Sequence, residues 1–159
     1  KTAYEMTSSL VGSEMCIRGS RQIGLIYQFF NLIPTLNVEE NITLPCELDG
    51  QTVDKKRLDK LIDELGLNGR KTHLPEELSG GQQQRVSIGR ALINRPAIVL
   101  ADEPTGNLDK KNSDEIVELL RRANQEYRQT IIMITHNLEI AKTADRVIVI
   151  EDGKIIREG

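Results

Sequence analysis

Two acidic residues, Asp102 and Glu103, end the apolar run AIVLADE, which is typical of a buried strand. Carboxylates at the end of a buried strand are costly unless cations accompany them. Because Mg²⁺ prefers oxygen ligands and retains several waters, Asp102 is a candidate to hold a metal-bound water. Glu103 is a candidate to orient or deprotonate a second water. A strand that ends at a solvated acidic turn is the alternative, and these two residues alone do not separate the two interpretations.

A second candidate site is the segment LSGGQ, in which Ser79 is followed by Gly80, Gly81 and Gln82. The serine offers a hydroxyl group, and the glycines allow backbone N–H groups to approach an anion closely. A helix predicted at residues 82–93 presents the positive end of its dipole to the same point. The segment therefore favours phosphate binding. An ordinary serine N-cap is the alternative, but it leaves the two glycines and the glutamine unexplained.

Three further polar segments follow apolar runs or a proline. His136 ends the run TIIMITH, where it is a candidate to hydrogen-bond a terminal phosphate and an attacking water. Gln28 follows the run IGLIY, and its amide is a candidate to reach a metal ion or a water. A satisfied core histidine and an unremarkable glutamine are the competing interpretations. The segment GNLD, residues 106–109, is by itself compatible with a turn after Pro104.

The apolar patterns also predict the elements that position these residues. Strands are predicted at residues 23–27, 97–103 and 130–136. A helix at residues 112–127, capped by Asn112 or Ser113, separates the last two strands. This order predicts an α/β fold with a parallel sheet and right-handed crossovers, whose ligands bind at the carboxyl ends of the strands. A short helix at LEIAKTAD follows, and the stretch RVIVIEDGKIIREG predicts an antiparallel edge with a type I′ turn at Asp152 and Gly153.

Residues 37–77, between the first strand and LSGGQ, are predicted to form a small helical insert. A short helix at residues 38–43 begins after Asn37, which is a helix-start residue. A second helix ends at Gly66. Its apolar residues share one face: Leu58, Leu61, Ile62 and Leu65.

The rest of the composition restricts the function. Residues 1–20 show neither periodicity nor turn signals and are interpreted as a leader of foreign origin, with a native flexible terminus as the alternative. Residues 21–159 then form the domain. The net charge of −3 and the absence of Trp argue against a nucleic-acid surface. No apolar run approaches the ~18 residues of a membrane span. Cys16 and Cys46 have no metal-binding spacing and are interpreted as free thiols of an intracellular protein.

The order of these motifs along residues 21–159 resembles the ATP-binding cassette (ABC) family, the motor subunits of ABC transporters. The most specific segments are LSGGQQQRVSIGRAL and ADEPTGNLD. Together with QFFNLIPTLNVEENITLP, the second resembles the branch that serves lipoprotein release, macrolide export and peptide export. The resemblance implies a P-loop NTPase-type parallel sheet with a helical subdomain insert. It also implies ATP and Mg²⁺ as cofactors.

The resemblance assigns roles to the chain's own ATP site. Asp102 matches the Walker B aspartate that holds magnesium. Glu103 matches the catalytic glutamate, and His136 matches the switch histidine. Gln28 matches the Q-loop glutamine, which reaches the metal and water and links the nucleotide state to the helical subdomain.

The resemblance further implies a head-to-tail dimer of two cassettes that encloses two ATP molecules. Ser79, Gly80 and Gly81, supported by Gln82, would then contact the γ-phosphate held by the second subunit. In the family, one loop links the two ATP sites of the dimer. Its residues are matched here by Asn107, Leu108 and Asp109.

Transmembrane permease subunits are the other implied partners, docking on the helical insert. They place the chain in the cytoplasm, peripheral on the inner face of the cell membrane. The implied function is to couple ATP binding and hydrolysis to export or extraction of a substrate.

The Walker A pattern GxxxxGK[ST] does not occur in the sequence, and the family places it upstream of the Q-loop strand. The chain therefore resembles a cassette fragment without the P-loop strand and N-terminal β-subdomain, and we expect it to be inactive alone. The alternative is a non-catalytic fragment that acts through dimer or membrane-partner contacts. The short separation of Gln28 from Ser79 argues against DNA-repair relatives, which insert a coiled coil there.

Overall fold

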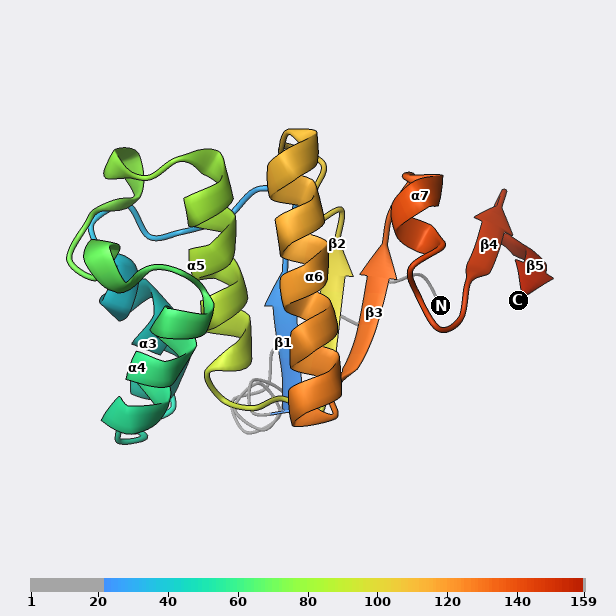
Figure 1. Cartoon of the computed structure of the whole chain (residues 1–159). Helices are drawn as coiled ribbons and strands as arrows, with labels where there is room; N and C mark the ends of the chain where they lie inside the picture. Colours follow the sequence, from blue (N-terminus) through green and yellow to red (C-terminus); the bar gives the residue numbers. More distant parts are fainter. Residues whose placement is uncertain (1–21, 159) are drawn as a thin grey trace.

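A parallel three-stranded sheet forms the centre of the protein, in a computed structural model that describes residues 22–158 (Figure 1). Its strands follow the order β1 (Ile23–Ile26), β2 (Ile98–Asp102) and β3 (Thr130–Ile134). In the register, Ile26 lies opposite Ala101, and Asp102 lies opposite Ile134. The three strands therefore end at one edge, which confirms the predicted α/β fold.

One face of the sheet is covered by α6 (Lys110–Tyr127), and α5 (Gly80–Leu92) lies beside β1 (Figure 1). The predicted caps of α6 were wrong, because the cap is Asp109, whose carboxylate accepts a hydrogen bond from the Asn112 backbone 2.9 Å away. Asp109 has the extended backbone of an N-cap, so Asn112 and Ser113 already lie in the first turn.

The stretch predicted as a helical insert contains α3 (Val38–Leu48), α4 (Lys55–Glu64) and two 3₁₀ turns, η1 (Asn68–Arg70) and η2 (Pro75–Glu77). The helix predicted at residues 38–43 was too short, since α3 continues through a proline. Its buried face repeats every fourth residue and continues beyond the proline: Val38, Ile42 and Cys46. The predicted apolar face of α4 is confirmed, because its leucine and isoleucine side chains are buried.

The helical insert packs tightly on α5. Gly89 of α5 makes this possible, because a Cβ there would lie 2.7 Å from the Leu65 side chain and 3.1 Å from Ile42. Arg57 of α4 donates to the carbonyls of Leu92 and Ile93, at 2.6 and 2.8 Å, where α5 ends. The insert and the sheet therefore share one hydrophobic core.

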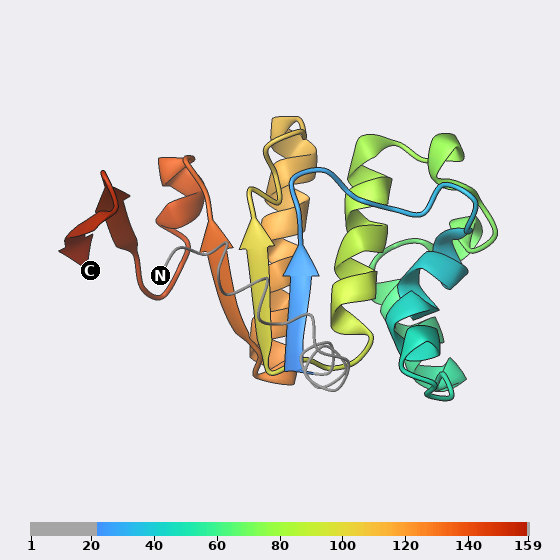
Figure 2. The same cartoon turned by 180° about the vertical axis from the view of Figure 1, so that it is seen from behind.

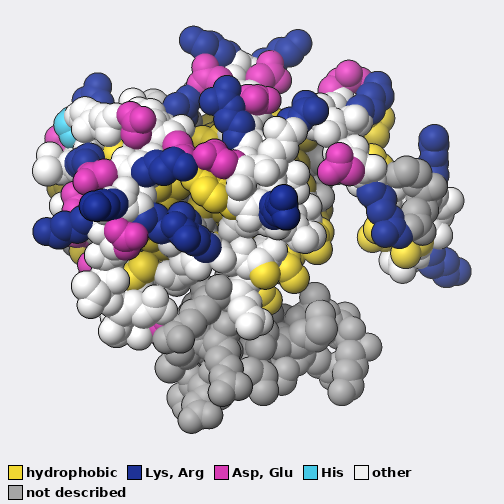
Figure 3. Space-filling model, turned by 60° about the horizontal axis from the view of Figure 1, so that its bottom comes forward, with side chains coloured by type: hydrophobic (Ala, Val, Ile, Leu, Met, Phe, Trp, Pro, Cys, Tyr) yellow, Lys and Arg dark blue, Asp and Glu magenta, His cyan; other side chains and the backbone are white. Residues whose placement is uncertain are grey.

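The hairpin of β4 (Ile148–Glu151) and β5 (Lys154–Glu158) follows the short helix α7 (Leu138–Ala141). Asp152 and Gly153 both have positive φ, at 48° and 73°, as a type I′ turn requires. The expectation that the hairpin forms an antiparallel edge of the central sheet was wrong, because among residues 22–158 β4 and β5 pair only with each other. The hairpin stands apart from the body in Figure 3.

Within the part of the chain that the structure describes, the second face of the sheet carries no helix (Figure 2). Side chains alternate along β1 and β2 between the buried and the exposed face. The exposed face is apolar: Ile23, Leu25, Leu100, Ile132 and Ile134.

On a different side of the molecule, the one seen in Figure 3, acidic and basic side chains are interspersed. None of the helices between residues 22 and 158 is both long enough and apolar enough to cross a membrane.

Candidate functional site

The candidate catalytic residues lie at the carboxyl ends of the three parallel strands. Gln28 follows β1, Asp102 ends β2 with Glu103 directly after it, and His136 follows β3. The N-terminal ends of α5 and α6 lie at the same edge of the sheet, at the top of Figure 1. Strand ends and helix N-termini thus converge at one edge, as in other open α/β sheets that bind phosphates.

Glu103 and His136 form the closest contact of the site. One carboxylate oxygen, Oε1 of Glu103, accepts a hydrogen bond from the His136 backbone N–H at 3.0 Å and lies 2.7 Å from Nδ1 of the ring. Because the carboxylate can only accept, this geometry requires the proton on Nδ1. The His136 side chain is 83% exposed, whereas that of Glu103 is 20% exposed. This exposure excludes a core histidine.

Glu103 also has an unusual backbone. Its φ is 44°, in the left-handed region that non-glycine residues rarely adopt. Two hydrogen bonds of 3.0 Å hold it there, one from its N–H to Ile134 and one from Gly106 to its carbonyl. Such a conformation costs about 1–3 kcal/mol and persists only where neighbouring contacts enforce it. The turn therefore directs the Glu103 carboxylate toward the end of β3, where His136 lies.

Gln28 contacts the loop that follows β2. The Asn107 amide donates to the Gln28 carbonyl at 3.1 Å, and the Gln28 amide reaches Asn107 Oδ1 at 3.5 Å. A Cβ on Gly106 would lie 2.9 Å from the Gln28 amide nitrogen, so a larger residue there would displace that flexible amide. The segments after β1 and β2 are thereby held together.

Ser79 caps α5, which begins at Gly80 rather than at residue 82 as predicted. The Ser79 backbone N–H donates to Oε1 of Gln82 at 2.9 Å, while the Ser79 hydroxyl accepts a long bond of 3.4 Å from the Gln82 backbone N–H. The capping interpretation therefore does account for the glutamine, contrary to the sequence argument. The weakly held Ser79 hydroxyl is exposed at the surface.

The two glycines after Ser79 differ in their surroundings. A Cβ on Gly81 would lie 2.4 Å from Oδ1 of Asn112, so Gly81 allows α5 to pack on the first turn of α6. A Cβ on Gly80 would meet only ordinary contacts, at 3.6 Å from the Phe30 ring and 3.8 Å from Leu108. Packing within the chain therefore requires Gly81 and leaves Gly80 unexplained.

The remaining predicted residues of the GNLD segment have contacts within the chain. Leu108 packs against the hydrophobic core. The Asp109 carboxylate accepts from the backbone and side chain of Asn112, and these bonds hold the pKa of Asp109 below its ordinary value.

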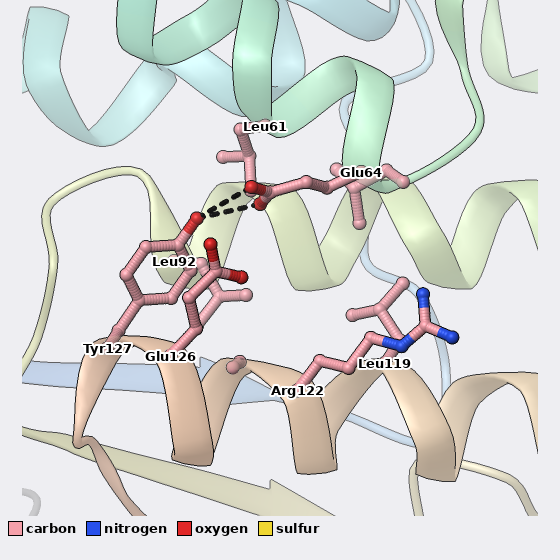
Figure 4. A pocket seen from close by; sticks show the side chains of 9 residues that line it. Leu61, Glu64, Leu92, Leu119, Arg122, Glu126 and Tyr127 are labelled. Atoms are coloured by element: carbon pink, nitrogen blue, oxygen red, sulfur yellow. Dashed lines mark hydrogen bonds between the residues drawn. The ribbon is translucent and has the colours of Figure 1, made fainter.

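A groove of about 790 Å³ lies beside Glu103 and His136, between α6 and α7. Thr135 and Asn137 contribute to its wall. A smaller cavity of about 130 Å³ lies away from the motif residues, where α4 meets α6 (Figure 4). We attach the chemistry to the groove, because Glu103 and His136, two of the four candidate catalytic residues, line it.

No group of three or more His, Cys, Asp or Glu side chains is arranged as a metal site between residues 22 and 158. The exposed Asp102 carboxylate still fits Mg²⁺, which takes one or two protein carboxylates and completes its shell with water and phosphate oxygens. Cys46 is a buried free thiol, and burial raises its pKa. Cys16 and the interpretation of residues 1–20 as a leader lie outside the described residues.

Two functional candidates escaped the sequence analysis, Gln84 and Arg90 of α5. Gln84 donates to the Tyr27 carbonyl at 3.4 Å, and Arg90 donates to the carbonyls of Phe30 and Asn31. The sequence signal was that a glutamine and an arginine occur within a helix, α5, most of whose residues are buried. Their partners are backbone atoms, however, and a side-chain pattern does not identify those.

The fold and this site define a class of protein, the ATP-binding cassettes. The family model described as "ABC transporter" matches residues 6–106, more than half of the chain. The chain belongs to the ABC transporter family. The match begins within the residues interpreted as a leader, and that interpretation stays a prediction.

Several relatives are similar over nearly the whole chain. The ABC transporter ATP-binding protein YbbA of Escherichia coli is 44% identical over 87% of this chain and 62% of its own length. The macrolide export ATP-binding/permease protein MacB of Rhodopirellula baltica is 43% identical over 95% of this chain, which is 23% of its own length. The chain thus spans less than two thirds of these relatives.

A solved structure confirms the fold. It is a dimeric ATP-binding cassette in a post-hydrolysis state bound to ADP and Pi. The TM-score is 0.82 at 38% sequence identity, over 96% of this chain and 68% of that one. The central sheet and the helical insert are therefore those of an ABC cassette.

Proposed function

We propose that the chain is part of the nucleotide-binding subunit of an ABC transporter, which couples ATP binding and hydrolysis to export or extraction of a substrate. The observation that carries this proposal is the convergence of Gln28, Asp102, Glu103 and His136 at one sheet edge in a member of this family. The named similarity to MacB favours the export branch.

Bound Mg²⁺ would neutralise phosphate charge and so lower the barrier to phosphoryl transfer. Asp102 and Gln28 are the residues of this chain that would hold the ion. Glu103 would orient the attacking water and accept its proton. His136, with its proton on Nδ1 as the contact with Glu103 requires, would hold the Glu103 carboxylate in position. Positioning of this kind supplies most of the catalysis in phosphoryl transfer.

The signature loop, residues 79–82, is proposed to complete the ATP site of a second cassette. Its support is the exposed, weakly bonded Ser79 hydroxyl and a Gly80 that no packing contact among the described residues requires. Backbone N–H groups at the start of α5 would bind a phosphate together with the helix dipole. The named dimeric state of the similar cassette supports a pair of cassettes, and the head-to-tail arrangement is part of this proposal.

Complementation between two inactive variants of the full-length protein tests this arrangement. Ser79→Arg disrupts phosphate binding by the signature loop, and Glu103→Gln replaces the carboxylate that positions the water. If each site combines Glu103 of one subunit with Ser79 of the other, the mixed dimer retains one intact site and ATPase activity returns on mixing. If both residues act within one chain, mixing restores nothing and the proposal of a shared site fails.

Permease subunits that dock on the helical insert are the proposed membrane partners, and they would hold the protein at the inner face of the cell membrane. The competing proposal is a non-catalytic fragment that acts only through such contacts. Isothermal titration of the full-length protein with Mg-ATP separates the two, since only the ATPase proposal requires tight binding there. The chain of this sequence alone is expected to bind ATP weakly and not to hydrolyse it.

A further inference from the structure

The segment between β1 and α3, residues 27–37, contains Gln28 and belongs to neither element. We call it the Q-loop. Side chains from other elements, rather than a neighbouring strand, hold most of its backbone. Asn41 of α3, which is fully buried, binds the second half through the N–H and carbonyl of Ile33 and the carbonyls of Leu36 and Asn37.

The first half of the Q-loop is held mainly by α5. Gln84 donates to the carbonyl of Tyr27 at 3.4 Å. Arg90 donates to the carbonyl of Asn31 at 2.7 Å and to that of Phe30 at 3.0 Å. Asn31 has a positive φ of 47°, and its carbonyl is one of the two that Arg90 binds.

No carboxylate competes for Arg90 among the described residues, and Tyr27, at the start of the same loop, is its other electrostatic neighbour. Within residues 22–158 it forms no ion pair, and the loop carbonyls are its hydrogen-bond partners. Burial lowers the pKa of Arg90, since a guanidinium loses water there without gaining a carboxylate. Removing water from a charge is costly, so the two charge-assisted bonds must offset that cost.

The same loop residue also reaches the signature loop. The Phe30 ring lies 3.6 Å from the position of a Cβ on Gly80, and Arg90 binds the Phe30 carbonyl. Phe30 therefore has its carbonyl bonded to Arg90 and its ring beside the start of α5, which carries the signature loop. On the other side, Asn107 binds the carbonyl of Gln28.

We propose that Arg90 is a positioning residue that holds Phe30 and Asn31 on α5, so that Gln28 and the signature loop move as one unit. This inference rests on the proposed ATPase function. Arg90 touches neither nucleotide nor water in it and acts through Gln28. A displacement of the helical insert would then reach Gln28 and Gly80 together, rather than each separately.

The kinetic test uses the full-length protein with Arg90→Met, which keeps the side-chain length, and Arg90→Lys, which keeps the charge. Misplacing Gln28 should lower kcat at least about tenfold, with partial rescue by lysine. The KM for ATP should change less than about threefold, because a positioning residue does not bind the substrate. Arg122→Met is the matched control, since Arg122 is exposed and pairs only with Glu118.

A double-variant cycle separates positioning from a general loss of stability. If Arg90 acts through Gln28, Gln28→Ala with Arg90→Met should be no slower than Gln28→Ala alone, within about twofold. Effects that multiply in the double variant would overturn the proposal.

A spectroscopic arm is independent of ATP hydrolysis. A nitroxide label at Phe29→Cys, in a background without the other two cysteines, reports Q-loop motion, because Phe29 is 70% exposed. Arg90→Met should sharpen its spectrum, and Arg122→Met should not. An unchanged spectrum in Arg90→Met would refute the anchoring. If the unsubstituted protein hydrolyses no ATP, the proposed function fails, and the label still decides whether Arg90 holds the loop.

Discussion

The hydroxyl group of Tyr127, at the end of α6, lies 2.8 Å from both carboxylate oxygens of Glu64 at the end of α4 (Figure 4). Lys60 adds ion pairs with Glu64 and Glu126 at 3.2 and 3.0 Å, and Arg57 lies over the Tyr127 ring. These contacts join the helical insert to the helix that covers the sheet. These contacts are polar, so α4 and α6 are connected here by hydrogen bonds and ion pairs in addition to apolar packing.

Replacing Tyr127 by Phe should lower the free energy of unfolding by about 0.5–1.5 kcal/mol, since one hydrogen bond is lost and the ring packing remains. Burial and the bond to Glu64 raise the pKa of Tyr127. A raised pKa means that the folded chain holds the proton more tightly, so this stabilisation is fully present below pH ~10 and is lost as the pH rises through the folded-state pKa. Urea unfolding of the wild type and of Tyr127→Phe, at pH 7 and at higher pH, measures the loss of stability and its dependence on pH. A difference between wild type and variant that stays constant above pH ~10 would contradict the assignment.

Glu103→Gln in the full-length protein should reduce ATP turnover by ~10²–10⁴-fold, because the amide cannot accept a proton from water. It should also trap the closed dimer with ATP bound, since positioning groups other than Glu103 remain. Steady-state phosphate release and size-exclusion chromatography with ATP measure the two effects. Glu151→Gln, at an exposed position of β4 outside the groove, is the control and should retain turnover. Undiminished turnover in Glu103→Gln removes Glu103 from the mechanism.

His136→Ala should reduce turnover by about 10²-fold, because the Glu103 carboxylate loses its contact with the ring. The backbone bond from residue 136 to Glu103 remains, so the fold should be retained. The variant His136→Ala combined with Glu103→Gln should be little slower than Glu103→Gln alone, since the two side chains act as a pair. Single-turnover kinetics of the four proteins provide the comparison. Strictly multiplicative losses would show that His136 acts without Glu103.

Gly81→Ala and Gly80→Ala form a matched pair. The new Cβ at position 81 would meet Asn112 at 2.4 Å, so Gly81→Ala should cost about 1–3 kcal/mol of stability. Gly80→Ala meets nothing closer than 3.6 Å and should leave the melting temperature unchanged while lowering ATP turnover. Thermal unfolding and ATPase assays distinguish the two. Equal melting temperatures for the pair would refute the packing argument for Gly81.

The parts of the fold that the sequence predicted are those with a strong local pattern. The apolar runs before Gln28, Asp102 and His136 predicted parallel strands correctly, because buried strands need continuous apolar side chains. The length of α3 and the cap of α6 were missed, because burial of Cys46 and the backbone of Asp109 depend on the surrounding structure.

The candidate site was predicted as a set of residues, and the contacts among them were not. Sequence order brought Glu103 and His136 to the same sheet edge, since parallel strands share a direction. The bond between their side chains depends on the positive φ of Glu103, which no residue pattern specified. Arg90 likewise binds the backbone carbonyls of residues 30 and 31, and the side chains at these positions do not indicate that their carbonyls have this partner.

The apolar second face of the sheet has a consequence for how the chain behaves during synthesis. Leu25, Leu100 and Ile132 are 44%, 37% and 51% exposed, and β3 pairs with β2 along only one of its edges within residues 22–158. A surface of this kind, with an open strand edge beside it, attracts chaperones and like chains at cellular concentrations. The time that a nascent chain spends on chaperones should therefore depend on how soon the apolar second face of the sheet is covered.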